Sequence, residues 1–287
     1  MSDNNAASIR IVVERVRVEG KGAILLTGPS SCGKGEIAKS ICSFLSLAGD
    51  QHVSMGEVLR RAIDSARTDT YRQTLSQEFG IGSDNSIFDV RHNSGDVMDK
   101  ARRHEDEIRR LRGNVAVEVS QLDWLNFCVS NGLLIPDSWA EAIIDAHFRK
   151  KSQLQDSIFV LDGYPRTTAA AEKLLETFDN LGIGIIKVIH LSITKEQMKV
   201  RAGHRARADD TDQALESRYQ IYIEKVQPCI DFLKMKLGQE KVALIDAHQP
   251  VFSDGGSLDV NRSIRAVTVS VIEALGLPQY LLDLDTP

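Results

Sequence analysis

Cysteine is scarce in this sequence of 287 residues, and its four cysteines lie far apart and form no C-x-x-C pair. Such spacing suits a reducing compartment and argues against a structural zinc site. No run of 18 apolar residues occurs, so no membrane-spanning segment is expected. Residues 1–10 are polar and acidic, so no signal peptide is expected either. These absences predict a cytoplasmic protein with no membrane partner.

An excess of basic residues is also missing. The formal net charge of −5 gives no support for a large nucleic-acid footprint, so no nucleic-acid partner is expected. The hydrophobic content of 42% allows a chain of this length to bury a full core. One elaborated domain, or one domain with insertions, is predicted. A monomer is expected, with a dimer left open.

Residues 23–36 read AILLTGPSSCGKGE and contain the spacing G-x-x-x-x-G-K at Gly28, Gly33 and Lys34. An apolar run leads into the first glycine, and apolar residues at helical spacing follow over 37–45. In such a loop the glycines let successive backbone N–H groups turn inward, and the following helix adds its positive end. The segment therefore predicts a phosphate-binding loop, with Lys34 among the β- and γ-phosphates of a nucleoside triphosphate.

Four further short apolar segments alternate with helical patterns and predict strands near 52–56, 157–161, 184–191 and 242–245. Alternating strands and helices predict an α/β fold: three layers, α/β/α, around a parallel central sheet. Ligands gather at the carboxyl ends of such strands, where Gly28 and Asp162 both lie. Ile9–Val18 alternates apolar with charged residues, which predicts an edge strand or short hairpin.

Residues 65–113 differ in composition from the rest and are read as a helical insertion between two parts of a core, 1–64 and 114–287. Within it, 101–112 predicts a charged helix with ion pairs from Glu105 to Arg109 and from Asp106 to Arg110. Two interpretations stay open, a solvated flap and a surface that contacts a partner or acceptor. An amphipathic helix is also expected over 115–127, and a long helix over 212–237.

Asp162 follows four apolar residues at a strand end, where a carboxylate suits a magnesium ion held through water. A turn or helix-capping aspartate is the alternative. Arg166 follows Pro165 at the start of a helix, a position unfavourable for a cation unless an anion is bound there. It is therefore predicted to hold a phosphate, against the alternative of a surface arginine. The run VRAGHRARADD over 200–210 suits either a solvated face or a mobile lid over polyphosphate.

These motifs together resemble the adenylate kinase family of nucleoside monophosphate kinases. Four separated blocks carry the resemblance, namely GPSSCGKGE at 28–36, SMGEVLR at 54–60, GLLIPD at 132–137 and LDGYPRT at 161–167. The resemblance implies a P-loop kinase with an acceptor-binding helical insertion, ATP and Mg²⁺ as donor and cofactor, and a short lid at about 200–211 without zinc.

The resemblance also implies roles for individual residues. Arg60 and Arg166 would bind the acceptor phosphate, while Arg205, Arg207 and Arg218 would grip the phosphates during transfer. Arg201 would lie against the donor adenine. The residues expected around ATP are Pro29, Ser30, Ser31, Cys32, Gly33, Lys34, Gly35, Glu36, Arg201 and Arg205. Those expected around the nucleoside monophosphate are Ser54, Met55, Arg60, Gly163, Arg166 and Ala170.

Three positions depart from the family pattern. Glu36 stands where the family has threonine, either bringing negative charge near the donor or turning outward. Ala170 stands where adenylate- and pyrimidine-directed members have glutamine or asparagine, and Met55 replaces a small residue or threonine. Because a paired hydrogen bond is what discriminates one base from another, the acceptor base stays open. The leading hypothesis is transfer of the ATP γ-phosphoryl to a nucleoside monophosphate. The alternatives are a silent nucleotide-binding regulatory module and a kinase of a non-nucleotide phosphate.

Overall fold

A five-stranded parallel sheet forms the centre of the molecule. The computed structural model describes residues 20–66, 68–111, 113, 118–205 and 212–277. In spatial order the strands are β2 (His52–Ser54), β3 (Ile158–Asp162), β1 (Gly22–Thr27), β4 (Ile185–Ser192) and β5 (Val242–Asp246). Every neighbouring pair is parallel, so all carboxyl ends share one edge of the sheet. The predicted parallel α/β fold is confirmed.

The central strand β1 explains why the sheet is covered on both faces. All six of its residues are buried. Because side chains alternate along a strand, Ala23 and Leu25 join one hydrophobic core while Ile24 and Leu26 join the other. A strand with no solvent-facing side needs apolar residues at every position, which is why its sequence shows a continuous run.

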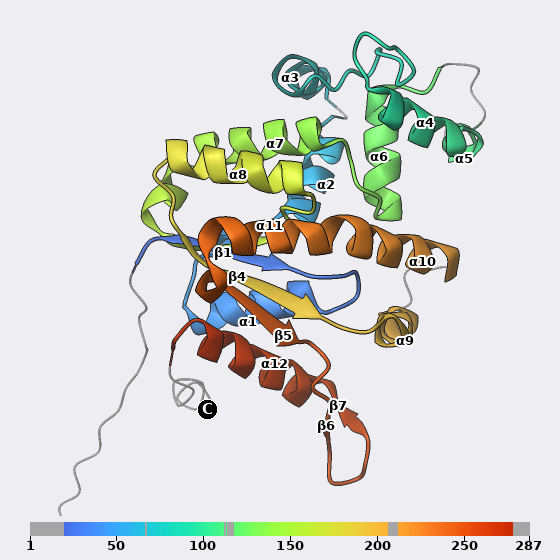
Figure 1. The fold of residues 1–287 in the computed structure, drawn as a ribbon. Coiled ribbons are helices and arrows are strands. Elements are labelled where there is room, and N and C mark those ends of the chain that lie inside the picture. Colours follow the sequence, from blue (N-terminus) through green and yellow to red (C-terminus); the bar gives the residue numbers. More distant parts are fainter. Residues whose placement is uncertain (1–19, 67, 112, 114–117, 206–211, 278–287) are drawn as a thin grey trace, which may run out of the picture.

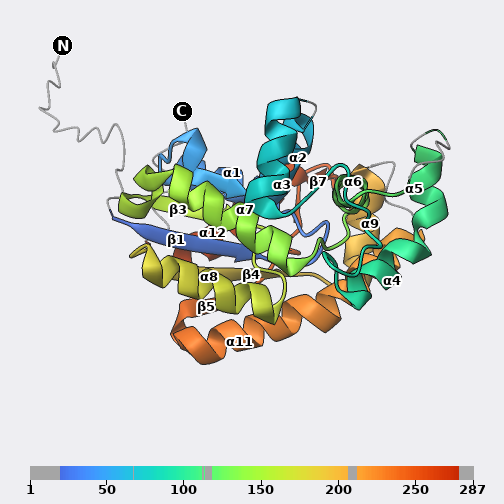
Figure 2. The same ribbon diagram turned by 90° about the horizontal axis from the view of Figure 1, so that it is seen from above.

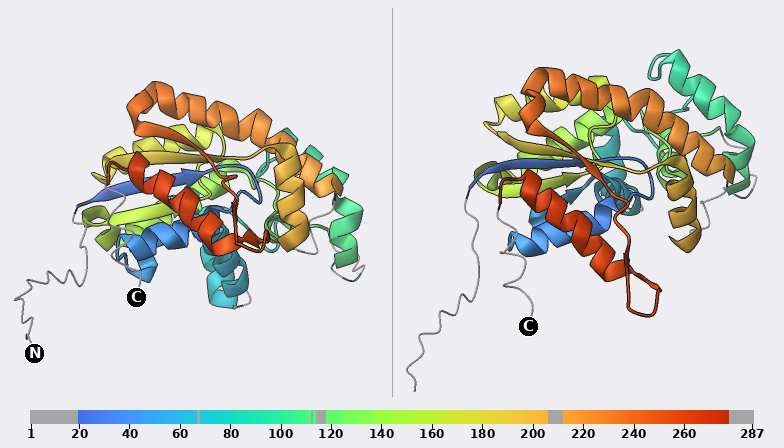
Figure 3. Two further views of the ribbon diagram at one scale, coloured as in Figure 1. Left: turned by 90° about the horizontal axis from the view of Figure 1, so that it is seen from below. Right: turned by 60° about the horizontal axis from the view of Figure 1, so that its bottom comes forward.

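Two helical layers cover these faces (Figures 1 and 3). On one side lie α7 (Asp137–Lys150), α8 (Thr168–Asn180) and α11 (Gln227–Leu237), which pack with one another and with the first core. On the other side α1 (Lys34–Phe44) packs against α12 (Val260–Ala274) over the second core. The three-layer arrangement follows directly from the two faces of β1.

The inserted region forms three helices, α3 (Asp69–Phe79), α4 (Gly95–Arg103) and α5 (Glu105–Leu111). They lie beyond α2 (Met55–Ser65) and α6 (Gln121–Asn131), away from the sheet (Figure 1). Figure 2 shows α4 and α5 at the same end of the molecule as α9 (Lys195–Arg205). Buried side chains of the insertion, including Leu75, Phe79 and Ile108, join the first core. The insertion is therefore packed onto the body of the protein.

The single charged helix expected over 101–112 is wrong, because α4 ends at Arg103 and α5 begins at Glu105. His104 between them leaves helical geometry, and its ring packs against Phe127 at 5.1 Å. The expected pair of Glu105 and Arg109 forms at 2.7 Å. Arg110 instead donates to the main-chain carbonyl of Asp106.

Two other predicted helices differ in detail. Residues 114–117 lie outside the described part of the chain, and α6 begins at Gln121, where Ser120 caps it. The long helix expected over 212–237 is divided into α10 (Asp212–Ile221), a π-helical turn (Tyr222–Val226) and α11. Pro228 accounts for the widened turn, because it lacks an N–H and its ring would clash with the carbonyl four residues earlier.

The remaining elements of the described ranges are a hairpin and three short turns. The hairpin β6 (Val251–Phe252) and β7 (Leu258–Asp259) precedes α12 and was not expected from the sequence. Short 3₁₀ turns occupy Gly49–Gln51, Ser152–Asp156 and Gln239–Lys241. The strand expected over Ile9–Val18 falls outside the described residues. None of the helices in the described ranges has the length and apolar composition needed to cross a bilayer.

Candidate functional site

The loop between β1 and α1 has the backbone conformation of an anion cradle. Gly28 follows the strand with a φ of 147°, and a Cβ there would collide with the carbonyl oxygen of Leu191. Ser31 and Gly33 have left-handed φ values of 59° and 92°. Residues of alternating handedness turn successive N–H groups toward one point, and α1 begins at the next residue, Lys34. The loop therefore combines a nest of N–H groups with a helix N-terminus.

The ammonium group of Lys34 lies across this loop. Its Nζ donates to the carbonyl oxygens of Gly28 at 3.0 Å and Pro29 at 2.7 Å. Cys32 is buried beneath the loop, with its Sγ 3.7 Å from the same nitrogen. A cation held at the mouth of a ring of N–H groups concentrates positive charge at one point. Of the eight loop residues expected to contact ATP, Cys32 alone does not line the adjoining cleft.

Glu36 lies at an exposed part of the cleft and pairs with a neighbouring lysine. The side chain is 58% exposed and pairs with Lys39 Nζ at 3.0 Å, one turn further along α1. Its N–H donates to the carbonyl of Gly33. The negative charge is thus paired with a neighbouring lysine, and both residues line the cleft.

Asp162 lies at the carboxyl end of β3, beside Ser54 of β2 and Leu26 of β1. The residue is 9% exposed, and its Oδ1 is buried without a hydrogen-bond partner. Its Oδ2 lies 3.9 Å from Nε2 of His52, which is also buried and unpartnered. The carboxylate also acts on Cys42, where burial first and Asp162 second raise the thiol pKa to about 11. An orphan carboxylate oxygen at this edge fits a hydrated Mg²⁺, which needs only one or two carboxylates.

No group of three or more His, Cys, Asp or Glu side chains that could ligate a metal directly occurs within the described ranges. Direct coordination by several side chains is therefore not offered there. A magnesium ion that keeps most of its waters is compatible with the single carboxylate of Asp162.

Two arginines line the same cleft as this carboxylate. Arg166 donates from Nε to the carbonyl of Gly163 at 2.9 Å. Burial lowers the pKa of Arg166, Arg218 lowers it further, and Asp162 acts in the opposite direction. Arg218 is 7% exposed and donates to the carbonyl of Asn131 at 2.9 Å. Half-buried Arg166 and buried Arg218 line the same cleft, where two cations can receive an anion.

Of the other predicted arginines, the structure describes the side chains of Arg60 and Arg201. Arg60 is exposed and lines the cleft, with its guanidinium group beside Gly56. Arg201 donates to the carbonyls of Cys32 at 3.1 Å and Ala247 at 2.6 Å, so it ties the phosphate loop to the segment after β5. The side chain of Arg205 and the whole of Arg207 lie outside the described part of the chain.

One cleft of about 940 Å³ joins these groups. It extends from the phosphate loop past Asp162 to the helices α2 and α6. All six residues expected around the acceptor line it: Ser54, Met55, Arg60, Gly163, Arg166 and Ala170. Polar donors gather toward the loop, whereas apolar side chains that include Leu59, Ile63 and Ile135 gather toward α2 and α7.

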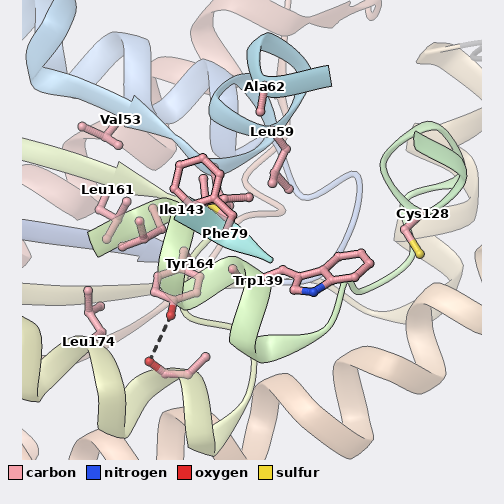
Figure 4. Close-up of a cluster of buried hydrophobic side chains, with 14 of the residues drawn as sticks. Val53, Leu59, Ala62, Phe79, Cys128, Trp139, Ile143, Leu161, Tyr164 and Leu174 are labelled. Atoms are coloured by element: carbon pink, nitrogen blue, oxygen red, sulfur yellow. Dashed lines mark hydrogen bonds between the residues drawn. The ribbon is translucent and has the colours of Figure 1, made fainter. Parts of the chain in front are cut away.

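Ala170 is buried and lies in the first turn of α8. Its carbonyl accepts a hydrogen bond from the hydroxyl group of Tyr164 at 3.3 Å, the contact drawn beside the core in Figure 4. Met55 is 5% exposed at the start of α2. Neither residue offers a side-chain hydrogen bond to a base.

A buried pair near Lys34 was not found by sequence reasoning. Nε2 of His190, in β4, lies 2.9 Å from the hydroxyl oxygen of Tyr222, and the two rings stack with centroids 5.7 Å apart. Burial first and Lys34 second lower the pKa of His190 to about 4. Tyr222 lines the cleft from the π-helical turn, an irregularity that often occurs at functional sites. The only sequence signal was a histidine inside an apolar strand.

Comparison with known proteins gives a family match. Residues 110–237 match the family model described as adenylate kinase. The matched range contains the segments at 132–137 and 161–167 and the arginine-rich run, but not the phosphate loop. The assignment of residues 28–34 as a phosphate-binding loop therefore depends on the geometry of the loop itself.

Several curated adenylate kinases are similar to this chain. That of Cyanothece sp. is 29% identical over 126 residues, which cover 42% of this chain and 62% of the relative. That of Trichodesmium erythraeum is 27% identical over 151 residues, 49% of this chain and 74% of the relative. That of Mycolicibacterium paratuberculosis is 27% identical over 106 residues, which cover 37% of this chain and 58% of the relative. Two of these three matches therefore span less than two thirds of the relative.

Proposed function

Because this chain belongs to the adenylate kinase family across residues 110–237, we propose that it is a phosphotransferase acting on nucleoside monophosphates. It would move the γ-phosphoryl group of ATP to the acceptor phosphate, giving ADP and a nucleoside diphosphate. The observation that carries the proposal is that Lys34, Asp162 and the two arginines Arg166 and Arg218 all line one cleft. Cations that line one cleft provide a site for the negative charge of phosphate groups.

The donor side uses the phosphate loop. Backbone N–H groups of residues 29–35 and the ammonium group of Lys34 would hold the β- and γ-phosphates. Arg201 would lie near the donor base, since it lines the same cleft and contacts the loop. Asp162 would hold Mg²⁺ through water, and that ion would neutralise charge on the donor phosphates.

On the acceptor side, Arg60 and Arg166 would bind the monophosphate. Arg218, with Arg205 and Arg207 from the predicted lid, would bear the charge that spreads over the phosphoryl group during transfer. The attacking oxygen belongs to an ionised phosphate, so no general base is required. Catalysis then consists of alignment, exclusion of water and positive charge.

The acceptor base is expected to be weakly selected. Ala170 and Met55, which stand at the two positions that differ from the family pattern, add no side-chain donor or acceptor to the cleft. A site without such a hydrogen bond rejects the wrong base by far less than one that leaves a buried polar group unpaired. Similar kcat/KM values for AMP, CMP, UMP and GMP are the expected outcome.

A coupled assay tests the proposal. Wild-type protein with Mg²⁺ and ATP is offered AMP, CMP, UMP, GMP and their deoxy forms, and ADP is measured. Lys34→Met should lower kcat about 10²- to 10³-fold by removing a charge that stabilises the transition state. Lys173→Met is the matched control, since Lys173 pairs with Glu176 on the exposed side of α8.

The alternatives give different outcomes. Tight binding of ATP with no ADP above background for any acceptor would sink the proposal and favour a regulatory module. ADP formed only with non-nucleotide phosphates would keep the kinase and change its acceptor. The pairing of Glu36 with Lys39 weakens one motive for the regulatory module, because it compensates the negative charge.

A further inference from the structure

Helix α6 ends at a glycine in the left-handed conformation. Gly132 has φ 67° and ψ 25°, and the N–H of the following Leu133 closes the helix by donating to the carbonyl of Cys128. The carbonyl of Asn131 belongs to the last turn, where helix carbonyls have no intrahelical donor and carry the negative end of the helix dipole. It accepts a hydrogen bond from a guanidinium nitrogen of Arg218 at 2.9 Å.

The guanidinium group of Arg218 lies directly on Gly132. A Cβ at this glycine would be 2.8 Å from Nε of Arg218, 3.0 Å from one terminal nitrogen and 3.1 Å from Cζ. Real Cβ atoms almost never approach other atoms below 3.0 Å, so any side chain at 132 would push the guanidinium group aside. Only glycine combines the left-handed backbone with room for this cation.

The contact joins two parts of the cleft that are distant in sequence. Arg218 lies 87 residues beyond Asn131, on the helix that follows the predicted lid. Gly132 follows the helix that leads from the insertion back to the core, and both residues line the cleft. Arg218 held in this position is also the cation that lowers the pKa of Arg166.

We infer that Gly132 is a positioning residue that acts through Arg218. By admitting the guanidinium group onto the negative end of α6, it sets the distance between Arg218 and Arg166. It thereby links the acceptor side of the cleft to the helix that follows the predicted lid. The inference rests on the proposed function, in which both arginines contact the transferred phosphoryl group and its acceptor.

The chain offers a closely matched control. Gly80 ends α3 with φ 66° and ψ 23°, almost the same backbone as Gly132, and a Cβ there would meet nothing within 4 Å. Alanine at either position therefore incurs the same left-handed strain. Only alanine at 132 collides with an arginine.

The experiment compares Gly132→Ala with Gly80→Ala. Both should lose thermal stability through the same left-handed strain, and Gly132→Ala should lose more because it also displaces Arg218. Gly132→Ala should lower kcat about 10- to 100-fold, as expected for a misplaced charge, with little change in the KM for ATP. Gly80→Ala should keep the wild-type kcat. In an Arg218→Ala background, Gly132→Ala should cause no further loss. Equal kcat for the two alanine variants, or an undiminished effect without Arg218, would overturn the inference.

A second readout does not depend on turnover. The NMR signal of the Arg218 Nε–H group, assigned by its loss in Arg218→Lys, should shift in Gly132→Ala and stay in place in Gly80→Ala. An unchanged signal in both variants would overturn the inference. If the wild-type protein forms no ADP but this signal shifts as expected, the proposed function is wrong. The contact between Gly132 and Arg218 would then still be supported.

Discussion

His190 illustrates how burial sets the protonation of a single residue. Its ring is 4% exposed between the sheet and Tyr222, and its Nδ1 has no hydrogen-bond partner. Burial disfavours the charged form, and the cation of Lys34 adds to this. The neutral ring keeps the space beside the phosphate loop free of a further cation.

Stability should therefore depend on pH through this residue. The pKa is about 4 in the folded state and near 6.5 in the unfolded state, so unfolding takes up a proton between those values. Lowering the pH from 7 to 5 should cost about 2 kcal/mol of unfolding free energy through His190. In urea unfolding, His190→Phe should lose less free energy of unfolding than the wild type over this pH range. His248→Phe, which changes an exposed histidine, should lose as much as the wild type. Equal losses in both variants would contradict the assignment.

The carboxylate of Asp162 carries a second prediction at this scale. Asp162→Asn removes the charge but keeps the shape, so Mg²⁺ should bind more weakly by about 10- to 100-fold. When the activity of this variant is titrated with Mg²⁺, the midpoint should lie at a higher Mg²⁺ concentration by that factor. Part of the activity should return at high Mg²⁺. Asp246→Asn, at the end of β5, serves as the control. An unmoved midpoint would show that the ion is held elsewhere.

At the scale of elements, α6 begins with a capping box. The N–H of Asp123 donates to Oγ of Ser120, and Oδ2 of Asp123 accepts from the N–H of Ser120. The sequence SQLD contains this signal, but the amphipathic pattern before it suggested an earlier start. Short polar motifs fix a helix end more sharply than hydrophobic periodicity does.

Removing the cap should destabilise the protein without harming chemistry. Ser120→Ala should lower the free energy of unfolding by about 1 kcal/mol, because donors of the first turn lose their partner. Ser130→Ala, near the other end of the helix and exposed, should change stability by less than about 0.5 kcal/mol. Denaturant unfolding at pH 7 measures both. If Ser120→Ala loses no more free energy of unfolding than Ser130→Ala, the cap does not stabilise the protein.

The strands were predictable because buried parallel strands leave runs of apolar residues, as in 157–161 and 184–191. Three features could not be predicted from the sequence. The break at His104 depends on a ring contact with α6, the π-helical turn depends on how Pro228 is accommodated, and the hairpin β6–β7 has only two residues in each strand. Each is decided by tertiary contacts or by lengths too short for periodicity to show.

At the scale of the whole molecule, the sheet topology is what assembles the site. The phosphate loop, Asp162 and Ser54 follow or end neighbouring strands, so residues far apart in sequence meet at one edge. This convergence was predictable from motif order. The contact of Arg218 with Gly132 and the stacking of His190 on Tyr222 were not, because neither leaves a spacing pattern in the chain.

Binding of the donor should stabilise the whole fold. If ATP binds the folded state alone, ATP at one hundred times its Kd should raise the free energy of unfolding by about 2.7 kcal/mol. Thermal unfolding with Mg²⁺ and ATP should show this shift in the wild type and its loss in Lys34→Met, while Lys173→Met should respond like the wild type. A wild-type transition that ATP leaves unmoved would contradict the donor site.

The burial of all four cysteines has a practical consequence. Burial raises the thiol pKa of Cys42 to about 11 and of Cys229 to about 12, which leaves little reactive thiolate near neutral pH. A maleimide dye should therefore react first with a cysteine introduced at the surface. One such position on α5 and another on α9 would let single-molecule fluorescence measure the distance between these two helices with and without ATP in the otherwise native chain.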